Sequence, residues 1–304
     1  MARKVMITVA PTGGFAQKAD NPHLPITPEE IADSVYKSWQ AGACIAAIHA
    51  RRDDGAITND PEVYRKINKL VRERCDIIIN NSTGGGLGPE MYKIHPDGSW
   101  EMDFEKRLWG TQAGAEMCTL DCQTQTIDFG KDRVPGITHT TEPGLFNTSW
   151  QRSKKMMEIM HKNGIKPEFE VMDLSHITDD ARNVLEMGLD NVPHYFDIVL
   201  GTNRRFQSAL PYSPKILDTM VDFLPKDTIF CVAAVGPAQL QANIQSLIKG
   251  GHVRTGLEDN LYFSRGVKAT NEMLVERIAG IIRMLGDEPA TPAEAREILG
   301  IKKR

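Results

Sequence analysis

Short apolar runs alternate regularly with amphipathic helical patterns along this chain. Few folds are compatible with such a pattern. Each run has the length of a strand, and capped helical patterns separate the runs. Such alternation indicates parallel strands joined by right-handed helical crossovers, and eight strands in 304 residues predict an α/β fold, the (β/α)₈ TIM barrel. The runs are Val5–Ala10, Cys44–His49, Asp76–Asn81, Glu116–Leu120, Pro167–Asp173, Tyr195–Gly201, Thr228–Val235 and His252–Leu257.

Helices are expected between these runs, and two stretches are less regular. Residues 84–98 are predicted to form a long loop, and residues 121–147 a loop with a short hairpin. No G-x-G-x-x-G motif follows the first run, which argues against an open dinucleotide-binding sheet. The sequence shows no linker and no repeat, so residues 1–304 are expected to form a single domain. The expected helices are Thr27–Ala41, Asp60–Arg74, Phe104–Ala113, Ser149–Asn163, Thr178–Met187, Pro214–Phe223, Pro237–Lys249, Ala269–Leu285 and a short one from Thr291.

Composition and charge argue against several classes of partner. The net charge of -4 gives no support for a nucleic-acid or membrane-surface partner, and no apolar run approaches the ~18 residues of a membrane span. The first run, Val5–Ala10, is too short for the apolar part of a signal peptide, so we expect a cytoplasmic protein. An odd number of cysteines in mostly apolar surroundings predicts reduced structural thiols at Cys44, Cys75, Cys118, Cys122 and Cys231.

The second run ends in Ile-His-Ala-Arg-Arg-Asp, which places basic side chains close together. Side chains alternate along a strand, so Ala47, His49 and Arg51 share one face. A histidine and an arginine that converge at the end of a strand are typical of the floor of an active site. The alternative is structural: His49 caps the edge of a strand, and Arg51 makes a surface ion pair.

Polar residues also gather at the ends of other runs, where a TIM barrel carries its active site. Ser82–Gly86 reads Ser-Thr-Gly-Gly-Gly; it lacks the lysine of a nucleotide P-loop, but its N–H groups suit a carboxylate. Glu168 and Glu170 share a strand face, and a buried carboxylate needs a partner such as an arginine or a metal. A third group lies at the end of the last run and consists of Arg254, Glu258 and Asp259. This group forms either a functional site or a structural ion-pair cluster.

Five blocks of the sequence resemble the β-keto acid cleavage enzymes, the family of the 3-keto-5-aminohexanoate cleavage protein. They are I-T-V-A-P-T-G-G, A-D-N-P-H-L-P-I-T-P-E-E-I, N-S-T-G-G-G, K-P-E-F-E-V-M-D and G-G-H-V-R-T-G-L-E-D-N. The likeness runs from Val5 to the closing T-P-A-E-A-R-E-I-L-G. The resemblance implies a (β/α)₈ barrel that catalyses a zinc-dependent acyl exchange, in which a β-keto acid and acetyl-CoA give acetoacetate and a new CoA ester.

The resemblance also implies a metal site with one altered position. The family holds its metal with an H-x-H pair and a glutamate, and these positions fall on Ala47, His49 and Glu258. Alanine cannot bind a metal, so two ligands remain, fewer than the three usual in catalytic zinc sites. A replacement ligand is left open among Glu170, His139, His176 and His252.

Further roles follow from the same resemblance. The acid–base pair of the family falls on Arg254 and Asp259, and its buried glutamate falls on Glu170. Phe15 stands where the aminohexanoate enzyme carries a carboxylate for the amino group, so we expect a neutral or apolar acyl tail. The complete set expected to bind substrate is Phe15, Arg51, Ser82, Thr83, Gly84 and Thr119.

Three functions remain open on these residues. The first is a β-keto acid cleavage enzyme with an altered metal site, which takes part in amino acid catabolism. The second is a metal-free barrel enzyme that uses Arg254 and Asp259 on a related keto acid. The third is a non-catalytic protein that binds a small carboxylate. The expected partners are a β-keto acid, acetyl-CoA and further copies of the chain in a homo-oligomer, a dimer or a tetramer.

Overall fold

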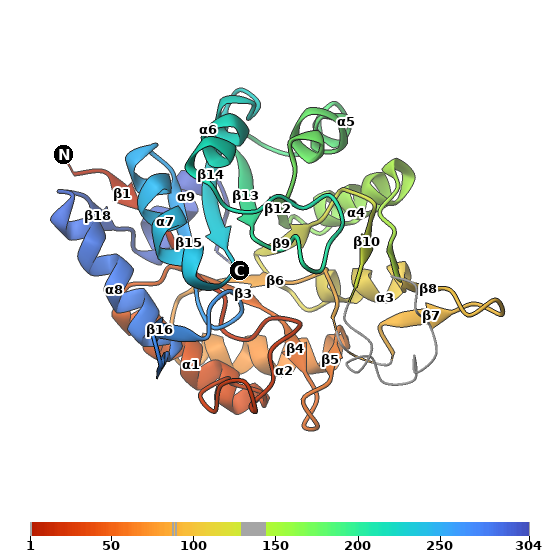
Figure 1. Cartoon of the computed structure of the whole chain (residues 1–304), viewed down its shortest axis with the longest axis horizontal. Coiled ribbons are helices and arrows are strands. Elements are labelled where there is room, and N and C mark those ends of the chain that lie inside the picture. Colours follow the sequence, from red (N-terminus) through yellow and green to blue (C-terminus); the bar gives the residue numbers. More distant parts are fainter. Residues whose placement is uncertain (1, 87, 89, 129–143, 304) are drawn as a thin grey trace.

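Eight parallel strands close into a barrel in a computed structural model that describes residues 2–86, 88, 90–128 and 144–303 (Figure 1). Each barrel strand pairs with the barrel strands that precede and follow it in the sequence, and the last strand, β15, pairs with the first, β2, to complete the ring. The TIM barrel predicted from the sequence is therefore confirmed. The barrel strands are β2 (Ile7–Val9), β3 (Ile45–Ile48), β6 (Ile78–Asn81), β9 (Met117–Leu120), β12 (Lys166–Val171), β13 (His194–Leu200), β14 (Thr228–Ala234) and β15 (His252–Thr255).

Each predicted run coincides with a barrel strand to within two residues at either end, and two of the differences affect how the chain is placed. The first run is divided, because the Met6 N–H donates to His252 Nδ1 at 3.0 Å. The residues before Met6 form β1 (Lys4–Val5), which pairs outside the barrel with β18 (Glu288–Pro289). The second run ends one residue early, so His49 follows β3 and lies on the loop above it.

Helices cover the outside of the barrel, as expected from their caps. Thr27 and Glu30 form a complete capping box at the start of the first helix, with Pro28 in its first turn. The helical pattern near residues 104–113 is a short α-helix followed by a 3-10 turn, and α5 follows a π-helical turn at His176–Ala181. The helices around the barrel are α1 (Pro28–Ala41), α2 (Pro61–Arg72), α3 (Phe104–Arg107), α4 (Trp150–Lys162), α5 (Arg182–Leu185), α6 (Pro214–Asp222), α7 (Gln239–Ile248) and α8 (Asn271–Met284).

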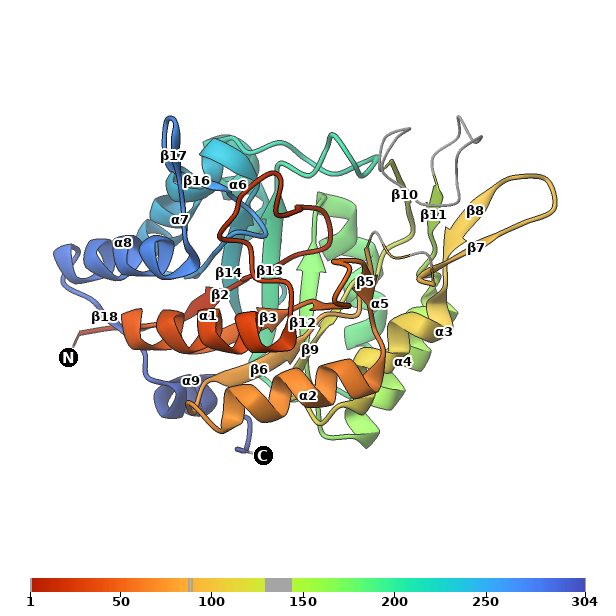
Figure 2. The same ribbon diagram turned by 90° about the horizontal axis from the view of Figure 1, so that it is seen from below.

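Small hairpins extend the carboxyl end of the barrel. The prediction of a loop over residues 84–98 was wrong in part, because β7 (Tyr92–Ile94) and β8 (Trp100–Met102) form an antiparallel hairpin there. The hairpin expected within residues 121–147 is present as β10 (Gln125–Ile127) and β11 (Gly144–Phe146). These strands form one sheet in the order β10-β11-β8-β7, which Figure 2 shows beside the barrel.

Helix α9 (Pro292–Leu299) packs against the amino-terminal end of the barrel (Figure 2). Ala295 and Leu299 are fully buried in one cluster with inward-facing residues at the start of the strands, Met6 and Ile45 among them. Arg296 fixes the helix from the side, since its Nε donates to Glu116 Oε1 at 2.7 Å. The described part of the chain contains no helix long and apolar enough to cross a membrane, and its five cysteines are free thiols, as predicted.

Candidate active site

A cavity of about 1210 Å³ opens at the carboxyl end of the barrel. Its walls come from the loops after the strands, and eight of the eleven residues predicted to form the site line it. The sequence rule that barrel strand ends carry the site thus brings residues far apart in the chain together. The eight are Phe15, His49, Ser82, Gly84, Glu170, Arg254, Glu258 and Asp259.

Arg254 is the centre of the charge network on the cavity floor. Its side chain is 3% exposed, and its Nη1 lies 2.7 Å from Glu170 Oε1 and 3.0 Å from Asp197 Oδ2. Its Nη2 lies 2.8 Å from Glu258 Oε1, and its Nε lies 3.2 Å from Asp259 Oδ2. Burial lowers the pKa of Arg254, but the four carboxylates outweigh burial and hold this pKa well above its usual value.

The carboxyl groups around Arg254 differ in pKa because their surroundings differ. Burial raises the pKa of Glu258, but the opposing effect of Arg254 and His49 is larger. The pKa of Glu258 therefore falls to about 2. Burial dominates at the neighbouring residue and raises the pKa of Asp259 to about 7. Burial and the adjacent Asp121 raise the pKa of Glu170 well above its usual value. Titratable groups with separated pKa values are the pattern expected of acid–base chemistry.

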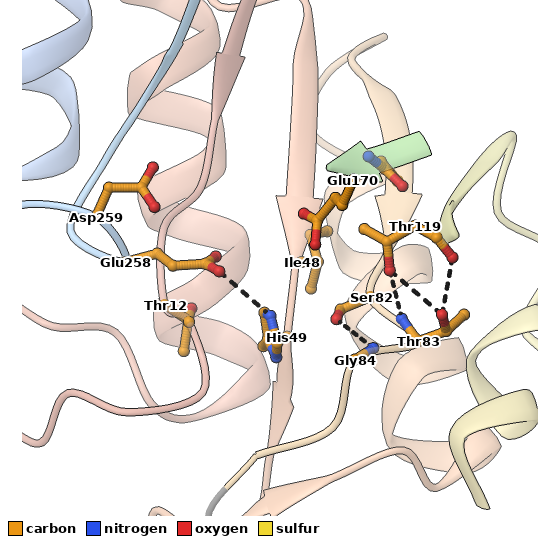
Figure 3. Close-up of polar contacts among 12 residues, drawn as sticks. Thr12, Ile48, His49, Ser82, Thr83, Gly84, Thr119, Glu170, Glu258 and Asp259 are labelled. Atoms are coloured by element: carbon orange, nitrogen blue, oxygen red, sulfur yellow. Dashed lines mark hydrogen bonds and ion pairs between the residues drawn. The ribbon is translucent and has the colours of Figure 1, made fainter. Parts of the chain in front are cut away.

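His49 and Glu258 meet at one side of the cavity (Figure 3). His49 Nε2 lies 3.4 Å from Glu258 Oε1, and two further buried atoms, His49 Nδ1 and Glu258 Oε2, have no hydrogen-bond partner. An imidazole and a carboxylate with unused donor atoms suit a divalent metal. Ala47 lies two residues before His49, on β3, and contributes only a methyl group to this side of the barrel.

The candidate replacements for the missing ligand are engaged elsewhere. Glu170 pairs with Arg254, and His176 Nδ1 accepts the Met172 N–H at 3.1 Å. His252 Nδ1 accepts the Met6 N–H, and burial lowers the pKa of both histidines to about 4. His139 lies outside the described residues. Among the described candidates, His49 and Glu258 are therefore the two side chains in contact at this position.

The predicted hydroxyl groups divide into one that faces the cavity and two that support it. Ser82 lines the cavity, and its Oγ accepts the Gly84 N–H at 3.1 Å (Figure 3). Thr83 Oγ1 donates to the Thr119 carbonyl at 2.8 Å, and the Thr83 N–H donates to Thr119 Oγ1 at 2.8 Å. This pair joins the ends of β6 and β9, and neither residue lines the cavity.

Arg51 also lies behind the wall, which corrects the expectation that it shares the cavity face with His49. The chain turns after β3 into a hairpin of β4 (Ala50–Arg51) and β5 (Ile57–Thr58), so strand alternation ends before Arg51. Its Nη2 donates to the carbonyls of Thr12 and Gly13 at 3.2 and 2.7 Å. The side chain thus fixes the loop after β2, where a Cβ on Gly13 would lie 2.5 Å from Glu258 Cγ.

Asp121 is a cavity residue that the sequence reasoning missed. It is buried, lines the cavity together with Glu170, and has one oxygen 3.7 Å from Arg107 Nη2. Burial raises the pKa of Asp121 above its usual value. The signal was available, because Asp121 directly follows the predicted run Glu116–Leu120, as Glu258 directly follows the run His252–Leu257.

A second missed group lies deeper in the barrel, on neighbouring strands. Candidate ligand atoms of Glu168, Asp197 and Cys231 all lie within 4.8 Å of one another, and all three side chains are buried. Glu168 Oε2 accepts from Asn80 Nδ2 at 2.5 Å, and burial raises the pKa of Glu168 to about 8. An acid inside the otherwise apolar run Tyr195–Gly201 was the sequence signal for Asp197.

Comparison with known proteins identifies the family. The sequence profile of the beta-keto acid cleavage enzymes matches residues 4–301. The chain is 38% identical to the 3-keto-5-aminohexanoate cleavage enzyme of Fusobacterium nucleatum over the full length of both proteins. It is 36% identical to the enzyme of the same name from Acetoanaerobium sticklandii, covering 99% of each. It is 30% identical to the 3-dehydrocarnitine:acetyl-CoA trimethylamine transferase of Rhizobium meliloti, covering 100% of this chain and 99% of the relative.

Solved structures agree on the fold. The apo structure of ObcA superposes with a TM-score of 0.70 at 18% identity, covering 92% of this chain and 66% of that chain. A type I 3-dehydroquinate dehydratase from Clostridium difficile superposes with a TM-score of 0.52 at 10% identity. Because the profile and full-length relatives match nearly every residue, this chain belongs to the β-keto acid cleavage enzymes.

Proposed function

We propose that this enzyme exchanges acyl groups between a β-keto acid and acetyl-CoA, giving acetoacetate and a new CoA ester. The observation that carries the proposal is the cluster of Arg254, Glu258 and Asp259 on the floor of the cavity. Relatives named as acetyl-CoA transferases support it, among them the 3-oxoadipate:acetyl-CoA acetyltransferase of Cupriavidus necator.

The reaction needs a base that makes a carbon nucleophile and a cation that steadies an oxyanion. Asp259 is the proposed base, because its raised pKa keeps the carboxylate basic near neutral pH. Arg254 is the proposed cation, since the carboxylates around it keep it charged and fix its guanidinium. Ser82 and the Gly84 backbone are proposed to hold the substrate carboxylate from the opposite wall.

The proposed reaction includes a divalent metal ion. His49 and Glu258 would hold a zinc ion, which when bound would act as a Lewis acid on the ketone. The residues present fit such an ion only in part, since Ala47 supplies no third ligand. That deficit favours a second candidate, a metal-free enzyme that uses Arg254 and Asp259 alone. The non-catalytic reading loses support, because the relatives are named as enzymes.

The wall around Phe15 supports a neutral or apolar acyl tail. Phe15 and Phe206 meet edge to face with ring centroids 6.2 Å apart, and Phe206 meets Phe146 in the same way at 6.1 Å. Arg205 and Arg107 already cover the Phe15 and Phe146 rings, at 5.0 and 3.9 Å. An ammonium on the substrate near Phe15 would lie close to the Arg205 guanidinium, which lines the cavity, and the two positive charges would repel each other.

The test measures metal content and turnover on one preparation. Acetoacetate release is followed with acetyl-CoA and a panel of β-keto acids that differ in tail length, charge and polarity. We expect turnover of apolar members of the panel. Absence of acetoacetate with every member would overturn the proposed reaction, and full turnover by protein stripped with a chelator would favour the metal-free candidate.

We further propose a cytoplasmic location, a role in amino acid catabolism and a homo-oligomeric state for this enzyme. The two relatives named for 3-keto-5-aminohexanoate cleavage support the catabolic role. Light scattering on the purified protein tests the assembly, since a monomeric mass would contradict it.

A further inference from the structure

Basic side chains stand at the mouth of the cavity, above its acidic floor. Arg204 and Arg205 lie on the loop after β13, and Arg265 lies in the turn between β16 (Tyr262–Ser264) and β17 (Val267–Lys268). Figure 2 shows this hairpin and the loop after β13 at the same end of the barrel. Three arginines thus stand in the part of the cavity lining away from the floor, which also includes Asp20 and Asp128.

Two of these arginines are available to a ligand. Arg204 and Arg265 are exposed and make no hydrogen bond or ion pair within the described part of the chain. Binding an anion would therefore break no existing ion pair of theirs. A guanidinium binds phosphate through two parallel hydrogen bonds, which makes arginine the preferred residue for this task.

The backbone that carries these arginines is held in place from several sides. The Asp128 N–H donates to the Arg205 carbonyl at 2.7 Å, and the Gln207 N–H donates to the Thr126 carbonyl at 3.1 Å. On the other side of the mouth, Arg277 of α8 donates to the Phe263 carbonyl at 2.6 Å and stacks on the Phe263 ring at 4.7 Å. Both segments are thus anchored to the scaffold.

The position and chemistry of the mouth suit the nucleotide end of a CoA thioester. The thioester must reach Arg254 and Asp259 on the floor, so the distant phosphates of the same molecule extend toward the entrance. Tyr262, which is 43% exposed, offers a ring on which a purine base can stack. TIM barrels also frequently bind phosphate with the loops after their seventh and eighth strands, and Arg265 lies after the eighth strand, β15.

We propose that Arg204 and Arg265 bind the phosphate groups of the CoA co-substrate. The inference rests on the proposed acyl exchange for the identity of the ligand. A carboxylate at the far end of a dicarboxylic keto acid has related chemistry, and the experiment separates the two sources.

The kinetic test compares two thioesters with the variants Arg204→Glu, Arg265→Glu and the double variant. Acetyl-CoA carries the phosphates, and S-acetyl-N-acetylcysteamine presents the same acetyl thioester without the nucleotide. We expect the double variant to lower the ratio of kcat/KM for acetyl-CoA to kcat/KM for the truncated thioester at least tenfold. Lys226→Glu is the control, because it makes the same charge change at an exposed position just before β14, at the other end of the barrel.

Two results would overturn the proposal. One is an unchanged ratio in the double variant. The other is a rise in KM for the β-keto acid with no change for acetyl-CoA, which would assign the arginines to a substrate carboxylate.

A binding measurement separates this inference from the proposed reaction. Adenosine 3′,5′-bisphosphate, the nucleotide fragment of CoA, is titrated calorimetrically into the wild-type protein and the double variant. We expect binding that CoA displaces in the wild type and at least tenfold weaker binding in the variant. Equal binding by both proteins would refute the phosphate site. Normal binding in a protein that turns over no β-keto acid would uphold the site and refute the reaction.

Discussion

His49 Nε2 lies 3.4 Å from Glu258 Oε1, although the two residues follow strands that β2 separates in the barrel. Two strand spacings amount to about 10 Å along a sheet. The side chains close that distance by reaching inward from the curved wall, and Glu258 fits there because Gly13 leaves room for it. The contact between His49 and Glu258 therefore depends on the closed barrel and on Gly13.

We predict weak metal binding that one substitution strengthens. Purified wild-type protein should hold clearly less than one zinc per chain, because His49 and Glu258 are two ligands where catalytic zinc sites have three. Ala47→His places a second imidazole at the end of β3, two residues before His49, and should raise the content to about one per chain. Elemental analysis and zinc titration measure both.

Matched variants make the metal prediction decisive. Ala47→Asn adds similar bulk with a poor zinc ligand and should leave binding weak, and His49→Ala should abolish it. A tight zinc in the wild-type protein would mean that another residue replaces the lost ligand. Absence of zinc in a folded Ala47→His protein would mean that His49 and Glu258 do not form a metal site.

Asp259→Asn should lower kcat by about 10²–10⁴-fold with little loss of stability. The asparagine oxygen can still accept the Arg254 Nε–H, and Arg254 keeps its other carboxylate partners. Asp287→Asn is the control, since Asp287 pairs with Arg3 away from the cavity. Steady-state turnover and thermal unfolding measure the two effects; full activity, or a protein that does not fold, would contradict the role as base.

The acyl tail can be tested with one pair of substrates. 3-Ketohexanoate and 3-keto-5-aminohexanoate share a carbon skeleton and differ in the ammonium group. An ammonium buried near Phe15 without a carboxylate costs several kcal/mol, so kcat/KM for the amine should be at least ~100-fold lower. Equal kcat/KM for the two substrates would show that another residue accepts the amine. The variant Phe15→Glu should narrow the difference in kcat/KM between them.

Acid should destabilise the protein through His252. Burial, helped by the nearby Arg3, lowers the pKa of His252 from 6.5 to about 4, so the unfolded chain binds more protons in this range. Stability from this group is therefore lost as the pH falls from about 6.5 to about 4, by about 3 kcal/mol. His252→Asn keeps an acceptor for the Met6 N–H and does not titrate.

Buried carboxyl groups titrate over the same range, so the difference between the two unfolding curves isolates His252. Denaturant unfolding at several pH values should show wild type losing stability relative to His252→Asn on acidification. Parallel curves would mean that His252 is not neutral in the folded protein.

Much of the fold could be predicted because each barrel strand is an apolar run of readable length between capped helices. The hairpin of β7 and β8 could not, because its three-residue strands are too short for an alternating pattern to be recognised. Arg51 shows a related limit: alternation holds only while the strand continues, and the chain leaves β3 before reaching Arg51.

The position of the site could be predicted from the sequence better than the roles of its residues. Strand ends located the cavity, and the family resemblance selected Arg254, Glu258 and Asp259 within it. Asp121 was overlooked because no quoted block contains it, although it follows a strand. That Thr83 and Thr119 bond to each other could not be read from the sequence, because the register between β6 and β9 decides it.

The helix that closes the amino-terminal end of the barrel has a consequence for the order in which reactants bind and products leave. Because α9 packs over that end among the described residues, we expect reactants and products to share the opening on the opposite side. If the keto acid binds against the cavity floor, as proposed, it has to enter before the bulky thioester. We therefore expect ordered kinetics, in which the β-keto acid binds before acetyl-CoA and the CoA ester leaves before acetoacetate.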